Sequence, residues 1–217
     1  MSRARLFFLC ALTFCTAGFA IAASYLQLKQ SSKPPLQHIK TLPDFSLTER
    51  SGKTVRLADL KGKVWLADFV YTTCPGPCRT ITRNMSELQN AMQQFPDVRL
   101  VSISTDPAHD SPQVLRDYAE NFHASSEKWL FLTGEKSKVY DLIEHGFLLP
   151  IAEQRDAEQP ILHSTKIMLV DKNGVIRAFY DGAELTPNSA NSDAATPASR
   201  EQTTAAIVND VRRLLRE

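Results

Sequence analysis

The sequence predicts an α/β domain in which helices flank a central sheet. Short apolar runs rich in β-favouring residues alternate with segments of helical periodicity. One of these runs, residues 64–71, is apolar almost throughout, as expected of a strand buried on both faces. Near the end, Asn173-Gly174 joins two further apolar runs, which is typical of a β-hairpin. The 217 residues, 43% of them hydrophobic, suffice for one such domain with extensions.

Each expected element has a local signal. A weakly alternating segment, residues 44–55, surrounds Ser51-Gly52 and predicts an N-terminal hairpin. The strands expected after it span residues 64–71, 98–104, 129–132, 165–170 and 175–180. The expected helices span residues 78–94, 111–122, 135–145 and 199–215. Apolar side chains spaced by four, three and four residues predict the first helix, namely Ile81, Met85, Leu88 and Met92. Ser111-Pro112 has the form of an N-cap followed by proline, and Ser199-x-x-Gln202 resembles a capping box.

The N-terminal region predicts a membrane anchor. Residues 6–28 carry no charge and follow Arg3 and Arg5, so the segment is long enough to span a bilayer and the rest of the chain is expected outside. A cleavable signal peptide is the alternative, because Ala20-Ile21-Ala22 has the form of a cleavage site, but the apolar run continues beyond it. Cys10 and Cys15 then serve as small apolar side chains.

The expected organisation is an anchor at residues 1–28, a proline-bearing linker at 29–42 and the α/β domain at 43–217. No Arg/Ser-rich transit peptide is present, which favours a bacterial inner membrane with the C-terminal domain in the periplasm. The 25 basic and 24 acidic residues form no basic stripe or acidic tail, so nothing in the sequence indicates a nucleic-acid partner.

The central chemical feature is the pair Cys74 and Cys78 in Cys74-Pro75-Gly76-Pro77-Cys78. The pair stands where the buried strand is expected to end and a helix to begin. A helix N-terminus stabilises a thiolate, which is the form that attacks disulfides and binds metals. A structural disulfide is the plainer interpretation, but it seldom occupies such a turn. Redox pairs of the CxxC kind have two intervening residues, whereas this pair has three.

A histidine at residue 163 can complete a metal site. A single histidine at the entrance of a strand is more often an ordinary surface residue. Together with Cys74 and Cys78, however, His163 gives a soft, three-coordinate donor set suited to Cu(I). Zinc prefers a fourth ligand, for which the remaining candidates are His109, His123 and His145.

Asp106 is a candidate supporting residue. Asp106-Pro107 follows the strand expected at residues 98–104, and such a dipeptide is ordinarily a turn starter. The carboxyl ends of strands in open α/β sheets line functional crevices, however. Asp106 is therefore a candidate to face the cysteines.

These residues resemble the Sco/SenC family of copper proteins, which serve cytochrome c oxidase assembly. The resemblance covers residues 40–217. It is carried by Asp44-Phe45-x-Leu47, Leu60-Lys61-Gly62-Lys63, Tyr71-x-x-Cys74-Pro75-x-x-Cys78, Ser104-x-Asp106-Pro107 and His163-Ser164. It implies a thioredoxin-like fold behind an N-terminal anchor, with copper held by Cys74, Cys78 and His163 and with Asp106 in support.

The resemblance also implies a function, delivery of Cu(I) to the dinuclear copper centre of the oxidase. The implied partners are the copper-bearing subunit of the oxidase, a copper donor and a thiol reductant; whether copper(II) is also held is left open. In two places the chain departs from the family pattern. Arg79 stands where many relatives have proline, and Leu162 stands where an acidic residue is common, so His163 lacks one candidate orienting partner.

Two other functions compete with the chaperone. A thiol–disulfide reductase would use Cys74 and Cys78 on the cysteines of the same copper centre. A peroxidase of the peroxiredoxin kind shares the fold, but the usual proline and threonine or serine before the reactive cysteine are replaced by Ala67 and Tyr71. The sequence therefore favours a metal carrier over a peroxidase and leaves the reductase open.

Overall fold

The structure is a computed structural model that describes residues 34–154, 160–183 and 197–217. The predicted anchor, with Cys10 and Cys15, lies outside the described residues, as does most of the low-complexity loop after Gly182. Within the described ranges, no helix is both long enough and apolar enough to cross a membrane. The chain divides into two units, Met1–Leu36 and Gln37–Glu217, and the fold below is that of the second.

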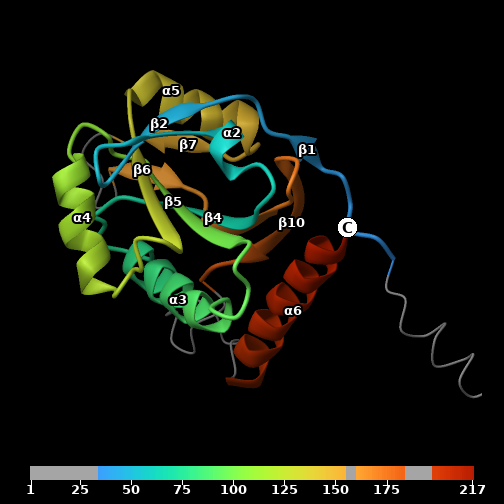
Figure 1. Ribbon diagram of the computed structural model, residues 1–217. Helices are drawn as coiled ribbons and strands as arrows, with labels where there is room; N and C mark the ends of the chain where they lie inside the picture. Colours follow the sequence, from blue (N-terminus) through green and yellow to red (C-terminus); the bar gives the residue numbers. More distant parts are fainter. Residues whose placement is uncertain (1–33, 155–159, 184–196) are drawn as a thin grey trace, which may run out of the picture. The chain divides into compact units, whose positions relative to one another are not determined.

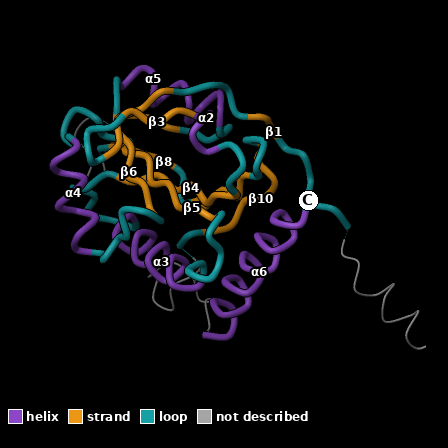
Figure 2. Tube along the Cα trace, in the orientation of Figure 1, coloured by secondary structure: helices purple, strands orange, loops and turns teal. Residues whose placement is uncertain are grey.

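An eight-stranded sheet forms the centre of the domain (Figures 1 and 2). Its strand order is β1-β10-β9-β4-β5-β6-β2-β3, in which β4, β5 and β6 run parallel and every other neighbouring pair is antiparallel. The strands are β1 (Lys40–Thr41), β2 (Ser46–Glu49), β3 (Thr54–Arg56), β4 (Val64–Val70), β5 (Val98–Ser104), β6 (Trp129–Thr133), β9 (Lys166–Val170) and β10 (Val175–Asp181). A separate two-stranded sheet pairs β7 (Ile151–Glu153) with β8 (Ile161–His163).

Helices cover both faces of the sheet, which explains why every residue of β4 is buried. Figure 1 shows α3 (Cys78–Ala91) and α6 (Pro197–Arg216) on one side of the sheet and α5 (Lys136–Asp141) on the other. The helix α4 (Pro112–Asn121) packs on β6, and the short α2 (Leu57–Leu60) follows β3. The α/β class and the flanking of the sheet by helices are thereby confirmed.

Most predicted elements are present, with shifted ends. The helix predicted over residues 78–94 ends at Ala91, and the helix predicted over 135–145 is α5 followed by a single π-helical turn, η1 (Leu142–Gly146). The last helix begins at Pro197, before the predicted cap at Ser199. The cap at Ser111 is confirmed, because its Oγ accepts a hydrogen bond from the N–H of Val114 at 3.3 Å.

Two pairings were not predicted. The strand β1 comes from the segment expected to be linker, and it adds to the sheet edge next to β10. The β7–β8 pair is the second, and its last residue is His163, which pairs in register with Ile151. Both pairings join residues that are distant or weakly patterned in the sequence, where periodicity gives no signal.

The candidate site lies at the carboxyl end of β4. The N–H of Thr105, directly after β5, donates to the carbonyl oxygen of Val70 at 2.8 Å, so the ends of β4 and β5 are held side by side. The chain then turns through residues 71–77 and enters α3 at Cys78. Since parallel strands end at one edge of the sheet, the loop after β4 and the loop after β5 meet there.

Candidate metal centre

The two cysteines occupy the turn between β4 and α3, as predicted. Cys78 is the first residue of α3 and is fully buried, whereas Cys74 is 6% exposed. The two cysteines are not joined in a disulfide. The N–H of Cys74 donates to the carbonyl oxygen of Tyr71 at 3.2 Å, which closes a tight turn ahead of the pair. The pair is thus held just beneath the surface, with Cys74 on the outer side.

His163 reaches the pair from the end of β8. Its Nε2 lies 3.2 Å from the Sγ of Cys78, and its Nδ1 lies 3.0 Å from the carbonyl oxygen of Ser164. A carbonyl oxygen can only accept, so Nδ1 carries the proton and Nε2 presents its lone pair to the sulfur. The backbone of Ser164 therefore orients the ring. A carboxylate at position 162 could have had the same role, but that residue is leucine.

The environment of the pair favours one thiolate and one thiol. Hydrogen bonding with Cys78 lowers the pKa of Cys74 to about 3, with further lowering by His163, Tyr71 and the backbone of Cys78, while burial opposes it. Hydrogen bonding with Cys74 and burial raise the pKa of Cys78. The remaining proton therefore belongs to Cys78, whose S–H donates to the Nε2 of His163.

A buried carboxyl group, Asp68, lies in β4 ahead of the cysteine loop. It is fully buried, and its Oδ1 accepts a hydrogen bond from the Oγ of Ser102 at 2.5 Å. The Oγ of Ser102 in turn accepts a hydrogen bond from the Nε1 of Trp129 at 2.8 Å. The Oδ2 of Asp68 has no hydrogen-bond partner among the described residues. Burial raises the pKa of Asp68 to about 7, against the hydrogen bond from Ser102 and the charge of His163.

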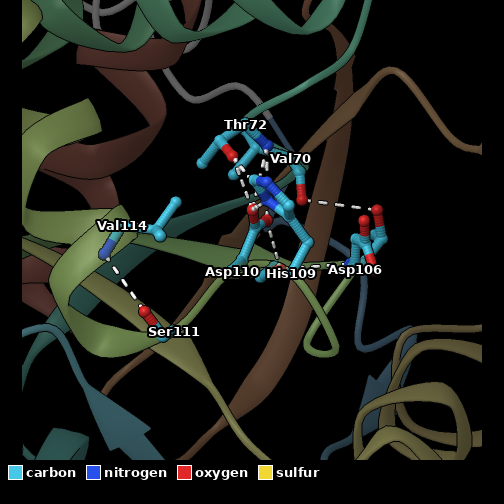
Figure 3. Close-up of polar contacts among 9 residues, drawn as sticks. Val70, Thr72, Asp106, His109, Asp110, Ser111 and Val114 are labelled. Atoms are coloured by element: carbon cyan, nitrogen blue, oxygen red, sulfur yellow. Dashed lines mark hydrogen bonds and ion pairs between the residues drawn. The ribbon is translucent and has the colours of Figure 1, made fainter.

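Asp110 is the carboxylate that contacts the cysteine loop. Figure 3 shows Thr72 and His109 converging on it. The Oγ of Thr72 and the Oγ of Ser104 each donate to Asp110 at 2.6 Å, the N–H of Thr72 lies 3.3 Å from both of its carboxylate oxygens, and the Nδ1 of His109 lies 3.2 Å away. Asp110 is fully buried. It therefore ties the loop that carries Cys74 to the loop after β5.

Asp106, the candidate supporting residue, lies in the loop directly after β5. It is half-buried, and its backbone N–H donates to the Oγ of Ser104 at 3.1 Å. Its charge contributes to raising the pKa of Tyr71, which places Asp106 near the site. Among the described contacts, its carboxylate accepts no hydrogen bond from either cysteine. Asp68 and Asp110 were not singled out by the sequence, because a buried polar side chain on a strand or loop has no periodic signature. Tyr71 was noted there only as part of the cysteine motif.

The three other histidines considered as fourth ligands have settings of their own. His109 faces Asp110, and the ring of His145 lies 3.1 Å from a carboxylate oxygen of Asp141. His123, just after α4, has a left-handed backbone with φ of 53° and an exposed side chain. Of the histidines in the described ranges, the one that contacts the cysteine pair is His163.

Cys78 and His163 lie slightly closer together than two ligands of one metal ion. In the three described ranges of the chain, no three His, Cys, Asp or Glu side chains are already spaced as a finished metal cage. Sulfur and nitrogen ligands of one trigonal ion, with bonds of about 2.3 and 2.0 Å, lie about 3.7 Å apart. The 3.2 Å contact between Cys78 and His163 is slightly shorter, as expected where the donors bond to each other. A separation of about half an ångström between the two donors would admit an ion.

The fold and the site together define a class, a thioredoxin-fold α/β protein with a dithiol and an imidazole at the carboxyl edge of its sheet. The sequence matches SCO1/SenC over residues 33–197, and the chain belongs to this family. The SCO1 protein homolog of Bacillus subtilis is 35% identical over 160 residues, covering 73% of this chain and 81% of that protein.

Two further comparisons carry information on function. A solved structure of BsSco, described as containing a disulfide switch and as a member of the Sco family of cytochrome c oxidase assembly proteins, superposes with a TM-score of 0.68 and 31% identity; the match covers 85% of this chain and 97% of that one. A Stutzerimonas stutzeri protein whose name describes copper binding is 27% identical over 156 residues, covering 69% of this chain and 74% of that protein.

Proposed function

We propose that this protein is a copper(I) metallochaperone that delivers copper to the dinuclear centre of cytochrome c oxidase. The observation that carries the proposal is the 3.2 Å contact between Cys78 Sγ and His163 Nε2, with the imidazole lone pair directed at the sulfur. Copper binding by the Stutzerimonas stutzeri relative and oxidase assembly by BsSco support it. Cys74, Cys78 and His163 are the proposed ligands.

The chemistry of the donors suits a carrier. Two sulfurs and one imidazole are soft ligands, which favour Cu(I) over hard divalent cations. A carrier must also release its cargo, and a three-coordinate ion can be passed on by stepwise ligand exchange. Cys74, 6% exposed, and the half-buried His163 are the ligands that an acceptor protein reaches first. The buried Cys78 is then the last ligand to let go.

Metal analysis of the reduced full-length chain tests the proposal. We expect one copper per chain, loss of that copper in Cys74→Ala, and a Cu(I) affinity in His163→Ala at least tenfold weaker than in the wild type. His145→Ala is the matched control, because it removes an imidazole that pairs with Asp141 instead. One zinc ion retained in place of copper, or unchanged copper affinity in His163→Ala, would contradict the proposal.

A second function, a thiol–disulfide reductase, is favoured by the lowered pKa of Cys74. The Cys74 thiolate would attack a disulfide of the target, form a mixed disulfide and release one target thiolate. Cys78 would then displace the second target thiolate, so that the target gains two electrons and the Cys74–Cys78 disulfide forms. In His163→Ala, disulfide exchange that persists while copper affinity stays unchanged would leave the reductase as the function.

We also propose that residues 6–28 anchor the domain to a bacterial inner membrane and place residues 43–217 in the periplasm. The uncharged length of the segment and the preceding Arg3 and Arg5 support this topology. Retention of the intact chain in membranes after a carbonate wash, with the domain accessible to protease in spheroplasts, is the expected result. Release of a shortened chain into the periplasm would favour a cleaved signal peptide.

A further inference from the structure

The cysteine loop, residues 71–77, leads from β4 into α3 and carries Cys74. Its second end is fixed by the helix, because Cys78 is the fully buried first residue of α3 and its carbonyl oxygen accepts a hydrogen bond from the Oγ of Thr82 at 2.9 Å. Two prolines lie between the cysteines, and their rings fix two backbone angles of the loop. The position of Cys74 therefore depends on what holds the first end of the loop.

Thr72 holds that first end by bonding to the carboxylate of Asp110 (Figure 3). Its Oγ donates to Oδ1 at 2.6 Å, and its backbone N–H lies 3.3 Å from each carboxylate oxygen. One residue of the loop thus directs its side-chain donor and its backbone donor at a single acceptor, 38 residues away in the sequence. Hydrogen bonds to a carboxylate are shorter and stronger than those between neutral groups, so this contact restrains the loop close to Cys74.

Asp110 is itself a fixed point. It is fully buried, its Oδ2 accepts a hydrogen bond from the Oγ of Ser104 at 2.6 Å, and its N–H donates to the carbonyl oxygen of Asp106 at 2.8 Å. The Nδ1 of His109, whose side chain is half-exposed, lies 3.2 Å from its Oδ1. The carboxylate cannot move without breaking these contacts, so it fixes the cysteine loop relative to the end of β5.

We propose that Thr72 is a positioning residue for Cys74, and that its bonded hydroxyl holds this thiol in place to bind a metal ion with the other two ligands. The inference rests on the proposed function, because it concerns a ligand of that same site. A ligand that is already in place binds the ion without the loss of conformational freedom that ordering a loose loop would cost. The alternative is that the bond only stabilises the domain and leaves the thiol unaffected.

Thr72→Val removes the hydroxyl and keeps the shape of the side chain. Thr73→Val is the matched control, because it makes the same change at the neighbouring residue, whose side chain is exposed. Both reduced full-length chains are compared with the wild type by competition with a chromophoric Cu(I) chelator. We expect Thr72→Val to bind Cu(I) about tenfold more weakly, the lower end of the usual effect of losing a group that orients a ligand. Thr73→Val should stay within about twofold of the wild type.

A second measurement needs no metal. The N–H of Cys74 donates to the carbonyl oxygen of Tyr71 at 3.2 Å, so its hydrogen exchange in the copper-free reduced chain reports how often the loop opens. Thr72→Val should raise this exchange rate about tenfold, because opening no longer breaks the bond to Asp110. Thr72→Ser keeps a hydroxyl that can reach the same carboxylate. It should restore the exchange rate and the copper affinity to within about twofold of the wild type.

Ser104→Ala separates positioning from a general loss of stability. It removes the other hydroxyl bonded to Asp110, at the same distance of 2.6 Å, but from β5 instead of the cysteine loop. In urea unfolding we expect Thr72→Val and Ser104→Ala to lower the midpoint by similar amounts, since each loses one hydroxyl donor. Copper binding should weaken in Thr72→Val alone. If Thr72→Val does not fold, Thr72→Ala decides, because it removes the same hydroxyl without placing a methyl group beside the buried carboxylate.

A copper affinity of folded Thr72→Val that matches that of Thr73→Val would overturn the inference, as would equal weakening in Thr72→Val and Ser104→Ala. An unchanged exchange rate of the Cys74 N–H in Thr72→Val would overturn it as well. Failure of the proposed function looks different: the wild type itself would then bind no copper, while the exchange rate would still show whether the hydroxyl of Thr72 holds the loop.

Discussion

The Nε2 atom of His163 lies 3.2 Å from the Sγ of Cys78, and the Nδ1 atom of the same ring lies 3.0 Å from the carbonyl oxygen of Ser164. The second contact determines the tautomer, and the tautomer directs the lone pair of the ring at the sulfur. A peptide carbonyl provides this orientation, so substitution of a neighbouring side chain cannot easily remove it. The proton that Cys78 carries lies between sulfur and nitrogen, where a soft metal ion would replace it.

We predict that Cys74 reacts as a thiolate in mildly acidic solution. Hydrogen bonding with Cys78 lowers its pKa well below that of an ordinary cysteine, so iodoacetamide should label Cys74 at pH 5, where a free thiol is almost inert. Peptide mass spectrometry of the reduced chain identifies the labelled residue, with Cys74→Ser as the control. Labelling of Cys78 before Cys74, or of neither cysteine below pH 7.5, would contradict the assignment of the thiolate to Cys74.

Asp110→Ala should destabilise the domain by about 2–4 kcal/mol, because it leaves the donors of Thr72 and Ser104 without their buried acceptor. Urea unfolding measures the loss. Ser104→Ala removes a single donor and should cost about 1 kcal/mol. In the double variant the two losses should be less than additive, since both act on one network. Additive losses would mean that Asp110 and Ser104 stabilise the loop independently.

Asp68 should make the domain less stable as the pH rises from about 4 to about 7. Burial raises the pKa of this carboxyl from 3.8 to about 7, so the folded state holds its proton more tightly than the unfolded state. The resulting stabilisation is complete below the unfolded pKa and is lost as the pH rises through the folded value. Asp68→Asn removes this dependence, so its stability relative to the wild type should increase between pH 4.5 and pH 8.

Urea unfolding at those two pH values measures the effect, at roughly 1.4 kcal/mol for each pKa unit. Asp97→Asn is the control, and its difference from the wild type should be nearly the same at both pH values. Lys63 lowers the pKa of the exposed Asp97 below 3.8, so the contribution of this carboxylate is present at pH 4.5 and at pH 8 and is lost only in stronger acid. A stability difference between Asp68→Asn and the wild type that is the same at both pH values would contradict the raised pKa.

Gly182→Ala should destabilise the end of β10 by about 1–3 kcal/mol. An added Cβ would lie 2.6 Å from the carbonyl oxygen of Thr165, and the N–H of Gly182 donates to that same oxygen at 3.0 Å. Since Thr165 is two residues beyond His163, copper affinity should also fall. Gly52→Ala is the comparison, because no atom lies within 4 Å of its added Cβ and its cost comes from φ of +86° alone. Equal copper affinity in both variants would exclude the effect on His163.

The local elements of the site could be predicted because their signals lie close together in the sequence. The apolar run of β4, the Pro-Gly-Pro turn and the spacing of Ile81 and Met85 place both cysteines between a strand and a helix. The β7–β8 pair could not be predicted in this way, because Ile151 and His163 pair only when distant backbone segments meet. The Asp-Pro turn drew attention to Asp106 in the sequence. In the structure, the fully buried carboxylate that bonds to the cysteine loop is Asp110, four residues later.

The available chemistry follows from the amino-acid sequence alone: two soft ligands, Cys74 and Cys78, lie close together at the start of a helix in an α/β domain. The spacing along the chain is sufficient for this prediction, because a strand-to-helix turn brings two cysteines four residues apart close together. The tertiary structure supplies the contacts: it brings His163, 85 residues beyond Cys78, within 3.2 Å of that sulfur, and it places the Ser164 carbonyl at the imidazole Nδ1. It also packs the Tyr71 ring against the imidazole and ties Asp110 to Thr72 in the cysteine loop. Such contacts depend on which strand ends the packed sheet brings together, and neither periodicity nor a local motif encodes that juxtaposition.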